Sequence, residues 1–217
     1  MAMSKAFTTP KGSLISRTDV NRKGRPRNVF LPRVTRPSWA TQFEDLTRRG
    51  LEQYLAGERK ADSFLNQEDV SFLVSIGTST QEIYDFLEDW YVYGEPSFET
   101  ALRITEVRAE YFLYEQQGCR STRVITPEEL PVPTAEIGGF PWLPRIMAKA
   151  HAKLRGEMSP EIMYSCKEDR AFLRKVGTEP AQFLRVVWSA DDDLDSIVEY
   201  VKISAQFQAG SDHHINC

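Results

Sequence analysis

Residues 68–78 read EDVSFLVSIGT, and residues 168–178 read EDRAFLRKVGT. The two segments are identical at six of eleven positions and lie 100 residues apart. In each, a Phe-Leu pair and a later aliphatic residue fall at i, i+1 and i+4, which is one apolar face of a helix, and a glycine then ends it. Two further pairs of short matches precede them in the same order: Leu55-Ala56-Gly57-Glu58 with Leu154-Arg155-Gly156-Glu157, and Leu31-Pro32-Arg33 with Leu143-Pro144-Arg145. Three matches in one order favour an internal repeat over chance.

The pattern around the repeat predicts helices almost throughout. Apolar residues recur at helical spacing across 38–118 and again across 141–208, and most of these segments open with Ser, Asn or acidic residues and close at Gly. Between them, residues 119–140 contain several prolines and two adjacent glycines, which excludes a helix of any length. We therefore predict an all-α fold: a helical unit at 38–118, a Pro-rich linker at 119–140, and a second, related helical unit with a short tail at 141–217.

Composition and size indicate an ordinary globular protein. The chain has 217 residues, of which 41% are hydrophobic and 27% charged, and it contains no apolar run long enough for a membrane helix and no apolar secretory segment near its start. A cytoplasmic location without membrane contact is the expectation. The three cysteines, Cys119, Cys166 and Cys217, are widely spaced and are interpreted as free structural thiols.

Charge is distributed unevenly along the chain. Residues 1–40 hold nine Lys or Arg and one acid, whereas the remainder holds 18 basic and 30 acidic residues. Residues 1–37 therefore form a predicted extended basic arm on an acidic body. Such an arm could bind phosphates, but the acidic body would repel a nucleic acid, so a protein partner or a second copy of the chain is favoured.

The stretch FPWLPRIMAKAHAKLRGEM, residues 140–158, suggests a ligand site. It predicts an amphipathic helix on which Arg145 and Lys149 lie one turn apart beside Trp142. This basic stripe is typical of a solvated helix face, yet Trp142 could stack on Arg145. Acidic and thiol groups follow within one helical hairpin and could face the stripe. The candidate ligand-binding residues for a carboxylate or phosphate are Trp142, Arg145, Lys149, Glu157, Cys166 and Asp169.

The segment GGFPWLPRIMAKAHAKLRGEM, followed by MYSCKEDRAFL, resembles the bacterial domain-of-unknown-function family 5069. The resemblance covers about residues 136–205. Two positions depart from the pattern of the family, Ala148 where an acid is usual and His151 where an Arg is usual. The family implies no activity, so the resemblance supports the helical fold and the motif positions only. These positions are Gly138, Gly139, Leu143, Pro144, Arg145, Lys149, Gly156, Tyr164, Asp169, Phe172 and Leu173.

No complete catalytic, nucleotide-binding or metal motif is present, so we predict no cofactor and no metal site. The terminal His213, His214 and Cys217 offer metal ligands, but a polar tail is the simpler reading. The leading hypothesis is a non-catalytic accessory or assembly subunit that binds a protein partner or itself through the basic arm. The alternatives are a small enzyme or anion-binding module with its site between the two helical units, and nucleic-acid binding by the arm.

Overall fold

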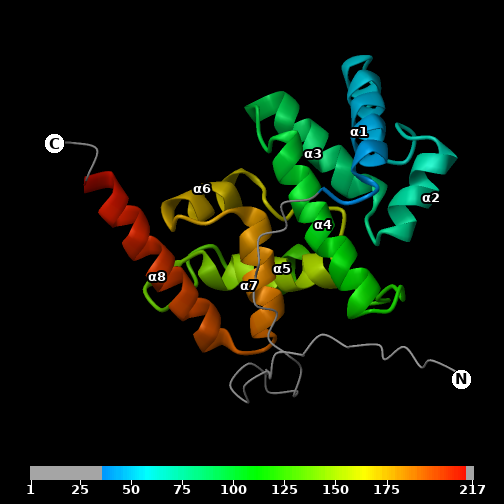
Figure 1. The fold of residues 1–217 in the computed structure, drawn as a ribbon. Coiled ribbons are helices and arrows are strands. Elements are labelled where there is room, and N and C mark those ends of the chain that lie inside the picture. The colour runs from blue at the N-terminus through cyan, green and yellow to red at the C-terminus, as the bar shows by residue number, and fades with distance from the viewer. Residues whose placement is uncertain (1–35, 214–217) are drawn as a thin grey trace, which may run out of the picture. The chain divides into compact units, whose positions relative to one another are not determined.

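The computed structural model describes residues 36–213, with side chains as far as Gly210. The described residues belong to one compact unit. Their secondary structure consists of α-helices joined by turns, one short 3-10 helix and one two-stranded hairpin (Figure 1). The all-α prediction is therefore confirmed for this part of the chain. None of its helices is both long and apolar enough to cross a membrane. The predicted basic arm, residues 1–37, falls almost wholly outside the described residues.

Three of the first four helices begin at a residue whose side chain caps them. The side chains of Asn66, Ser79 and Ser97 each accept a hydrogen bond from the backbone N–H three residues later, which satisfies an otherwise orphaned donor. Ser79 and Glu82 form a complete capping box. The helices are α1 (Ala40–Leu55), α2 (Gln67–Ser75), α3 (Thr80–Tyr93) and α4 (Phe98–Tyr114).

The last four helices follow the proline-rich segment. They are α5 (Leu143–Arg155), α6 (Lys167–Lys175), α7 (Pro180–Ala190) and α8 (Leu194–His213). Pro180 occupies the first position of α7, where its missing N–H costs nothing. α5 starts after Trp142, whose backbone is left-handed at φ 73°, and ends at Gly156.

Residues 119–140 are folded against the helices. They contain η2 (Pro127–Glu129) and the antiparallel pair β1 (Glu136–Ile137) and β2 (Phe140–Pro141), and β1 lies against α5. Ile125 is buried and pairs with Met158 just beyond α5. The segment has no α-helix, as its prolines predict, and it covers part of α5.

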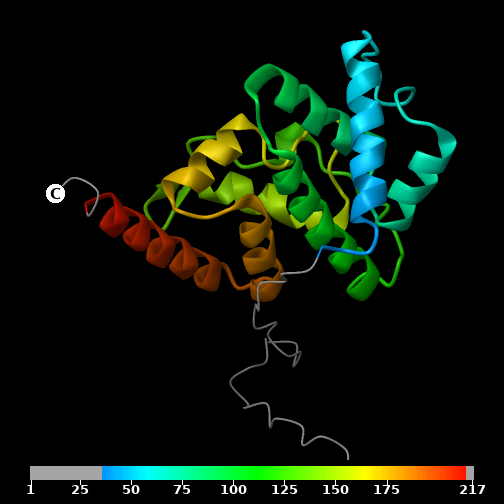
Figure 2. The same ribbon diagram turned by 45° about the horizontal axis from the view of Figure 1, so that its top comes forward.

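α4 lies at the centre of the unit. It packs against α5 and α7, and more lightly against α1, while α7 also packs against α5 and α8. Figures 1 and 2 show α1 and α2 at one end of the unit and α8 at the other. Leu102, Ile104 and Val107 of α4 are fully buried, and each such side chain contributes about 1.5–3 kcal/mol to stability. Helices from both sides of the 119–140 segment therefore share one core.

The matching segments 68–78 and 168–178 adopt similar local structures. α2 and α6 have nine residues each and end in a turn where Gly77 and Gly177 take φ values of 72° and 67°. Left-handed backbone of this kind favours glycine. Thr78 N–H donates to Leu73 O at 2.9 Å, and Thr178 N–H donates to Leu173 O at 3.0 Å.

Candidate functional site

α5 and α6 bring together a buried ion pair. Lys149 Nζ lies 2.9 Å from Asp169 Oδ2, and the two side chains are 6% and 0% exposed. Trp142 Nε1 donates to the other carboxylate oxygen at 2.9 Å, and the backbone N–H of Ser165 donates to Oδ2 at 3.0 Å. We call Trp142, Lys149, Ser165, Cys166 and Asp169 the Lys149–Asp169 centre. Both oxygens of the buried acid have protein partners, so its charge is satisfied internally.

Two residues of this centre have left-handed backbone. Trp142 and Ser165 have φ values of 73° and 67°, which non-glycine residues rarely adopt. Each donates to Asp169 from this conformation. Strain of this kind persists only where the surrounding contacts impose it.

Cys166 is not an activated thiol. Lys149 Nζ lies 3.3 Å from its Sγ, and the thiol donates to Glu168 Oε2 at 3.2 Å. Burial, followed by the negative charge of Asp169, raises the pKa of Cys166 to about 11. Because the thiolate is the nucleophile, a thiol protonated at neutral pH is poorly suited to nucleophilic catalysis.

The remaining predicted residues lie apart from this ion pair. Arg145 donates to the backbone oxygen of Pro131 at 2.8 Å, and its guanidinium lies 5.7 Å from the centroid of the Trp142 ring. Glu157 follows the other end of α5, where it accepts from Ser121 Oγ at 2.8 Å. Of the six predicted ligand-binding residues, the structure brings Trp142, Lys149, Cys166 and Asp169 together. Lys149 is committed to Asp169, so it is not an open donor for a ligand.

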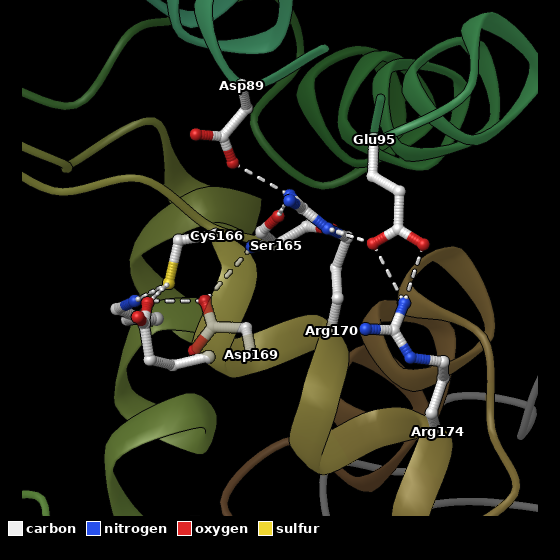
Figure 3. A network of polar contacts seen from close by, with 9 residues as sticks. Asp89, Glu95, Ser165, Cys166, Asp169, Arg170 and Arg174 are labelled. Atoms are coloured by element: carbon white, nitrogen blue, oxygen red, sulfur yellow. Dashed lines mark hydrogen bonds and ion pairs between the residues drawn. The ribbon is translucent and has the colours of Figure 1, made fainter. Parts of the chain in front are cut away.

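The polar contacts continue from α6 to the first helices. Arg170 donates to Ser165 O, to Asp89 Oδ2 at 2.8 Å and to Glu95 Oε2 at 3.2 Å. Arg174 donates to both oxygens of Glu95 at 2.9 Å. Figure 3 shows these side chains converging from α6, α3 and the α3–α4 connection. A cavity of about 390 Å³ borders this group, but its two arginines are paired with acids.

A second polar centre surrounds a cavity of about 260 Å³, which we call the Arg108 cavity. It lies between the α2–α3 turn, α3, α4 and the residues that follow α5. Residues on both sides of the 119–140 segment therefore contribute to it. Its polar lining includes Thr78, Ser79, Gln81, Glu82, Asp85, Arg108, Arg120, Ser121 and Ser159.

Arg108 is buried without a carboxylate partner among the described residues. Its residue is 1% exposed, and its hydrogen bond is to the neutral amide oxygen of Gln116 at 2.8 Å. Burial lowers the pKa of Arg108, although an arginine stays charged at neutral pH. Buried cations are ordinarily paired, so this guanidinium has unused capacity to bind an anion.

Three buried polar atoms around the cavity lack hydrogen-bond partners within the described part of the chain. They are Thr78 Oγ1, Arg108 Nε and Ser159 Oγ. Their residues are 1%, 1% and 8% exposed. Because most buried polar atoms in proteins are hydrogen-bonded, such a group around one cavity indicates partners supplied by a bound molecule or by solvent.

The acids of the cavity differ in their pairing. Glu82 is paired with Lys153, with 2.7 Å between Oε1 and Nζ. Asp85 accepts from the neutral amide of Gln81 at 2.7 Å, and no described basic group lies within ion-pair distance of it. Burial raises the pKa of Asp85 to about 7, and the charge of Glu82 adds to this rise. Asp85 is thus partly protonated at neutral pH.

The sequence interpretation missed Arg108, Asp85 and Ser159. The sequence did contain one indication of a buried arginine: Arg108 falls four residues after Ile104, on the apolar face of its helix. No comparable pattern marks Asp85 or Ser159, since they lie on other elements.

No metal site emerges from the described residues, in which no three His, Cys, Asp or Glu side chains are grouped to hold an ion. The His213, His214 and Cys217 side chains lie outside the side chains described. No protein-family model, curated protein or solved structure matches the chain.

Proposed function

We propose that this protein is a helical binding module that holds a small anionic ligand, a carboxylate or a phosphate, in the Arg108 cavity. The observation that carries the proposal is Arg108, a residue that is 1% exposed and whose guanidinium is hydrogen-bonded to a neutral amide. Hydrogen bonds to charged groups contribute about 1.5–3 kcal/mol each, so one bidentate contact gives useful affinity. The hydroxyls of Thr78 and Ser159 would complete the anion's coordination.

The cavity also suits a site between two helical units. Thr78, Asp85 and Arg108 belong to residues 38–118, and Ser159 belongs to residues 141–217. A bound anion would link the two parts and stabilise the folded state through its binding free energy.

Calorimetric titration with phosphate and with acetate tests this function. We expect saturable binding of at least one of them to the wild-type protein and a loss of about tenfold or more in Arg108→Met. Arg48→Met is the matched control, because Arg48 is an exposed α1 residue and its removal changes net charge equally. Absence of binding to the wild type, or equal loss in both variants, would contradict the proposal.

A second candidate is assembly through the basic arm, supported by the charge difference between residues 1–40 and the rest of the chain. Size-exclusion chromatography of full-length protein and of protein lacking residues 1–37 tests it. We expect the shorter protein to lose a partner or a second copy. An unchanged assembly state would contradict this role, and arm-dependent, salt-sensitive binding of DNA or RNA would support the nucleic-acid alternative instead.

We also propose that residues 38–118 and 141–217 are related by duplication. Two ion pairs support this: Arg49 of α1 with Asp69 of α2, and Lys149 of α5 with Asp169 of α6. Buried positions of α1 recur 100 residues later in α5: Phe43, Leu46, Gly50 and Tyr54 against Leu143, Ile146, Ala150 and Leu154. The resemblance of residues 136–205 to the domain-of-unknown-function family 5069 remains part of this proposal. Superposition of α1–α3 on α5–α7 in an experimental structure tests the duplication, and helices that fail to overlay would contradict it.

A further inference from the structure

The Arg108 cavity contains two side chains of opposite charge that do not pair with each other. Arg108 projects from α4 and Asp85 from α3, and both line the cavity. Neither forms an ion pair among the described residues, and the hydrogen-bond partner of each is a neutral amide, Gln116 for Arg108 and Gln81 for Asp85. Glu82, the other acid lining the cavity, is already paired with Lys153, and Arg120, the other lining cation, donates to the backbone oxygen of Thr78 at 3.4 Å.

We propose that the ligand of this cavity is a small zwitterion, an amino-acid-like molecule whose carboxylate binds Arg108 and whose ammonium group binds Asp85. This inference rests on the proposed function, because it assigns the anionic group to Arg108 and adds a cationic group at Asp85. A simple anion would satisfy the guanidinium and leave the acid unpaired. A zwitterion supplies a partner of opposite charge to both, and it adds no net charge to a cavity that already contains both signs.

The size and remaining lining of the cavity agree with such a ligand. A volume of about 260 Å³ accommodates a molecule of several non-hydrogen atoms, larger than an inorganic ion. Ser159 Oγ and Thr78 Oγ1 add buried hydroxyls without hydrogen-bond partners among the described groups. Met158 and Ile162 add apolar lining, which suits the methylene carbons of a short chain.

A bound ammonium group would favour the ionised form of Asp85. Glu82 and Glu88 on α3 disfavour its ionised form, and Lys153 of α5 favours it. A bound cation would add a second favourable charge and lower the pKa of Asp85. Zwitterion affinity should therefore rise as the pH increases from 6 to 8 and Asp85 ionises, whereas the affinity of a simple carboxylate should stay level or fall.

A matched ligand series tests the inference by calorimetry. Glycine, β-alanine and γ-aminobutyrate carry both charges at increasing separation, and acetate, propanoate and butanoate are the corresponding acids without the ammonium group. We expect at least one amino acid to bind about tenfold or more tightly than its matched acid at pH 8. Because the Arg108–Asp85 separation selects one chain length, the other members of the series should bind more weakly.

Asp85→Asn completes the test, because it keeps the size of the side chain and removes its charge. In this variant we expect the amino acid to bind no more tightly than the matched acid, while the acid itself still binds. Asp45→Asn, on the exposed surface of α1, is the control and should preserve the preference. If every acid binds as tightly as its amino-acid partner in the wild type, the zwitterion inference is wrong and the anion site stands. If neither class binds, both proposals fail.

Discussion

The Lys149–Asp169 centre and the Arg108 cavity both hold a buried cation on a core helix, and they satisfy it in opposite ways. Lys149 has a carboxylate at 2.9 Å whose two oxygens also accept from Trp142 and Ser165. Arg108 donates to the neutral amide of Gln116 and lines a cavity. A closed set of contacts stabilises the fold, whereas an unpaired buried charge costs stability and is tolerated where it serves binding. This difference supports a structural role for the Lys149–Asp169 centre and the proposed ligand-binding role for the Arg108 cavity.

The largest expected effect is the loss of stability when the Lys149–Asp169 centre loses its carboxylate. Asp169→Ala leaves Lys149 buried without a carboxylate, and removing one partner of a buried pair costs about 3–5 kcal/mol. Chemical denaturation measures the free energy of unfolding. Asp69→Ala is the control, because its partner Arg49 is 40% exposed and can turn to water, so we expect a loss of about 1 kcal/mol there.

A double substitution separates loss of the pair from loss of its charge. Lys149→Met combined with Asp169→Leu removes both charges at similar volume, and we expect it to recover most of the stability lost in Asp169→Ala. A double variant as unstable as the single one would show that packing, rather than an unpaired charge, controls this centre.

The next effect is a pH dependence of stability from Asp85. Its pKa is about 7 in the folded protein against an ordinary value of 3.8, so the folded state retains a proton that the unfolded chain releases. The free energy of unfolding is therefore unaffected by the ionisation of Asp85 below pH 4. It falls as the pH rises through 7, by at most about 4 kcal/mol. Asp85→Asn does not ionise, so it should gain stability relative to wild type between pH 4 and 7. A constant difference across thermal melts in that range would contradict this.

A smaller effect in stability, with a large one in binding, is expected for Arg108→Met. The substitution removes a buried charge that lacks a carboxylate, so the free energy of unfolding should change by no more than about 1 kcal/mol. Ligand affinity should fall about tenfold or more. A loss of several kcal/mol in urea denaturation would place Arg108 in the structural class with Lys149 and weaken the comparison.

The smallest expected effect on ligand binding concerns Trp142. Trp142→Phe removes one hydrogen bond to the Asp169 carboxylate and should cost about 1.5–3 kcal/mol through that bond, partly recovered if water reaches the oxygen. Its effect on binding in the Arg108 cavity should be negligible, because Trp142 does not line that cavity. Parallel denaturation and titration curves check both statements.

The sequence indicated which residues meet in the Lys149–Asp169 centre better than it indicated those of the Arg108 cavity, because the former are close together along the chain. Lys149 lies on one helix and Cys166 and Asp169 lie at the next helix start, so chain connectivity alone suggests that they meet. The helical spacing of apolar residues also predicted helices on both sides of residues 119–140. Arg145 was placed near Trp142 by its spacing, but its hydrogen bond to Pro131 depends on how residues 119–140 fold back, which the spacing does not specify.

The Arg108 cavity could not be assembled from local patterns. Asp85, Arg108 and Ser159 come from α3, α4 and the segment after α5, and only tertiary packing brings them to one space. A charged residue on an apolar helix face is also ambiguous, because a long side chain can extend to water. Arg108 stays inside, where its guanidinium lies 5.2 Å from the Phe112 ring.

Crystals soaked in selenate offer the most direct measurement of the difference between the two centres. The anomalous signal of selenium locates a bound tetrahedral anion without reference to any assumed ligand. We predict a peak inside the Arg108 cavity within hydrogen-bonding distance of the guanidinium, and no peak beside Lys149. Selenate beside Lys149 with none at Arg108 would contradict the account.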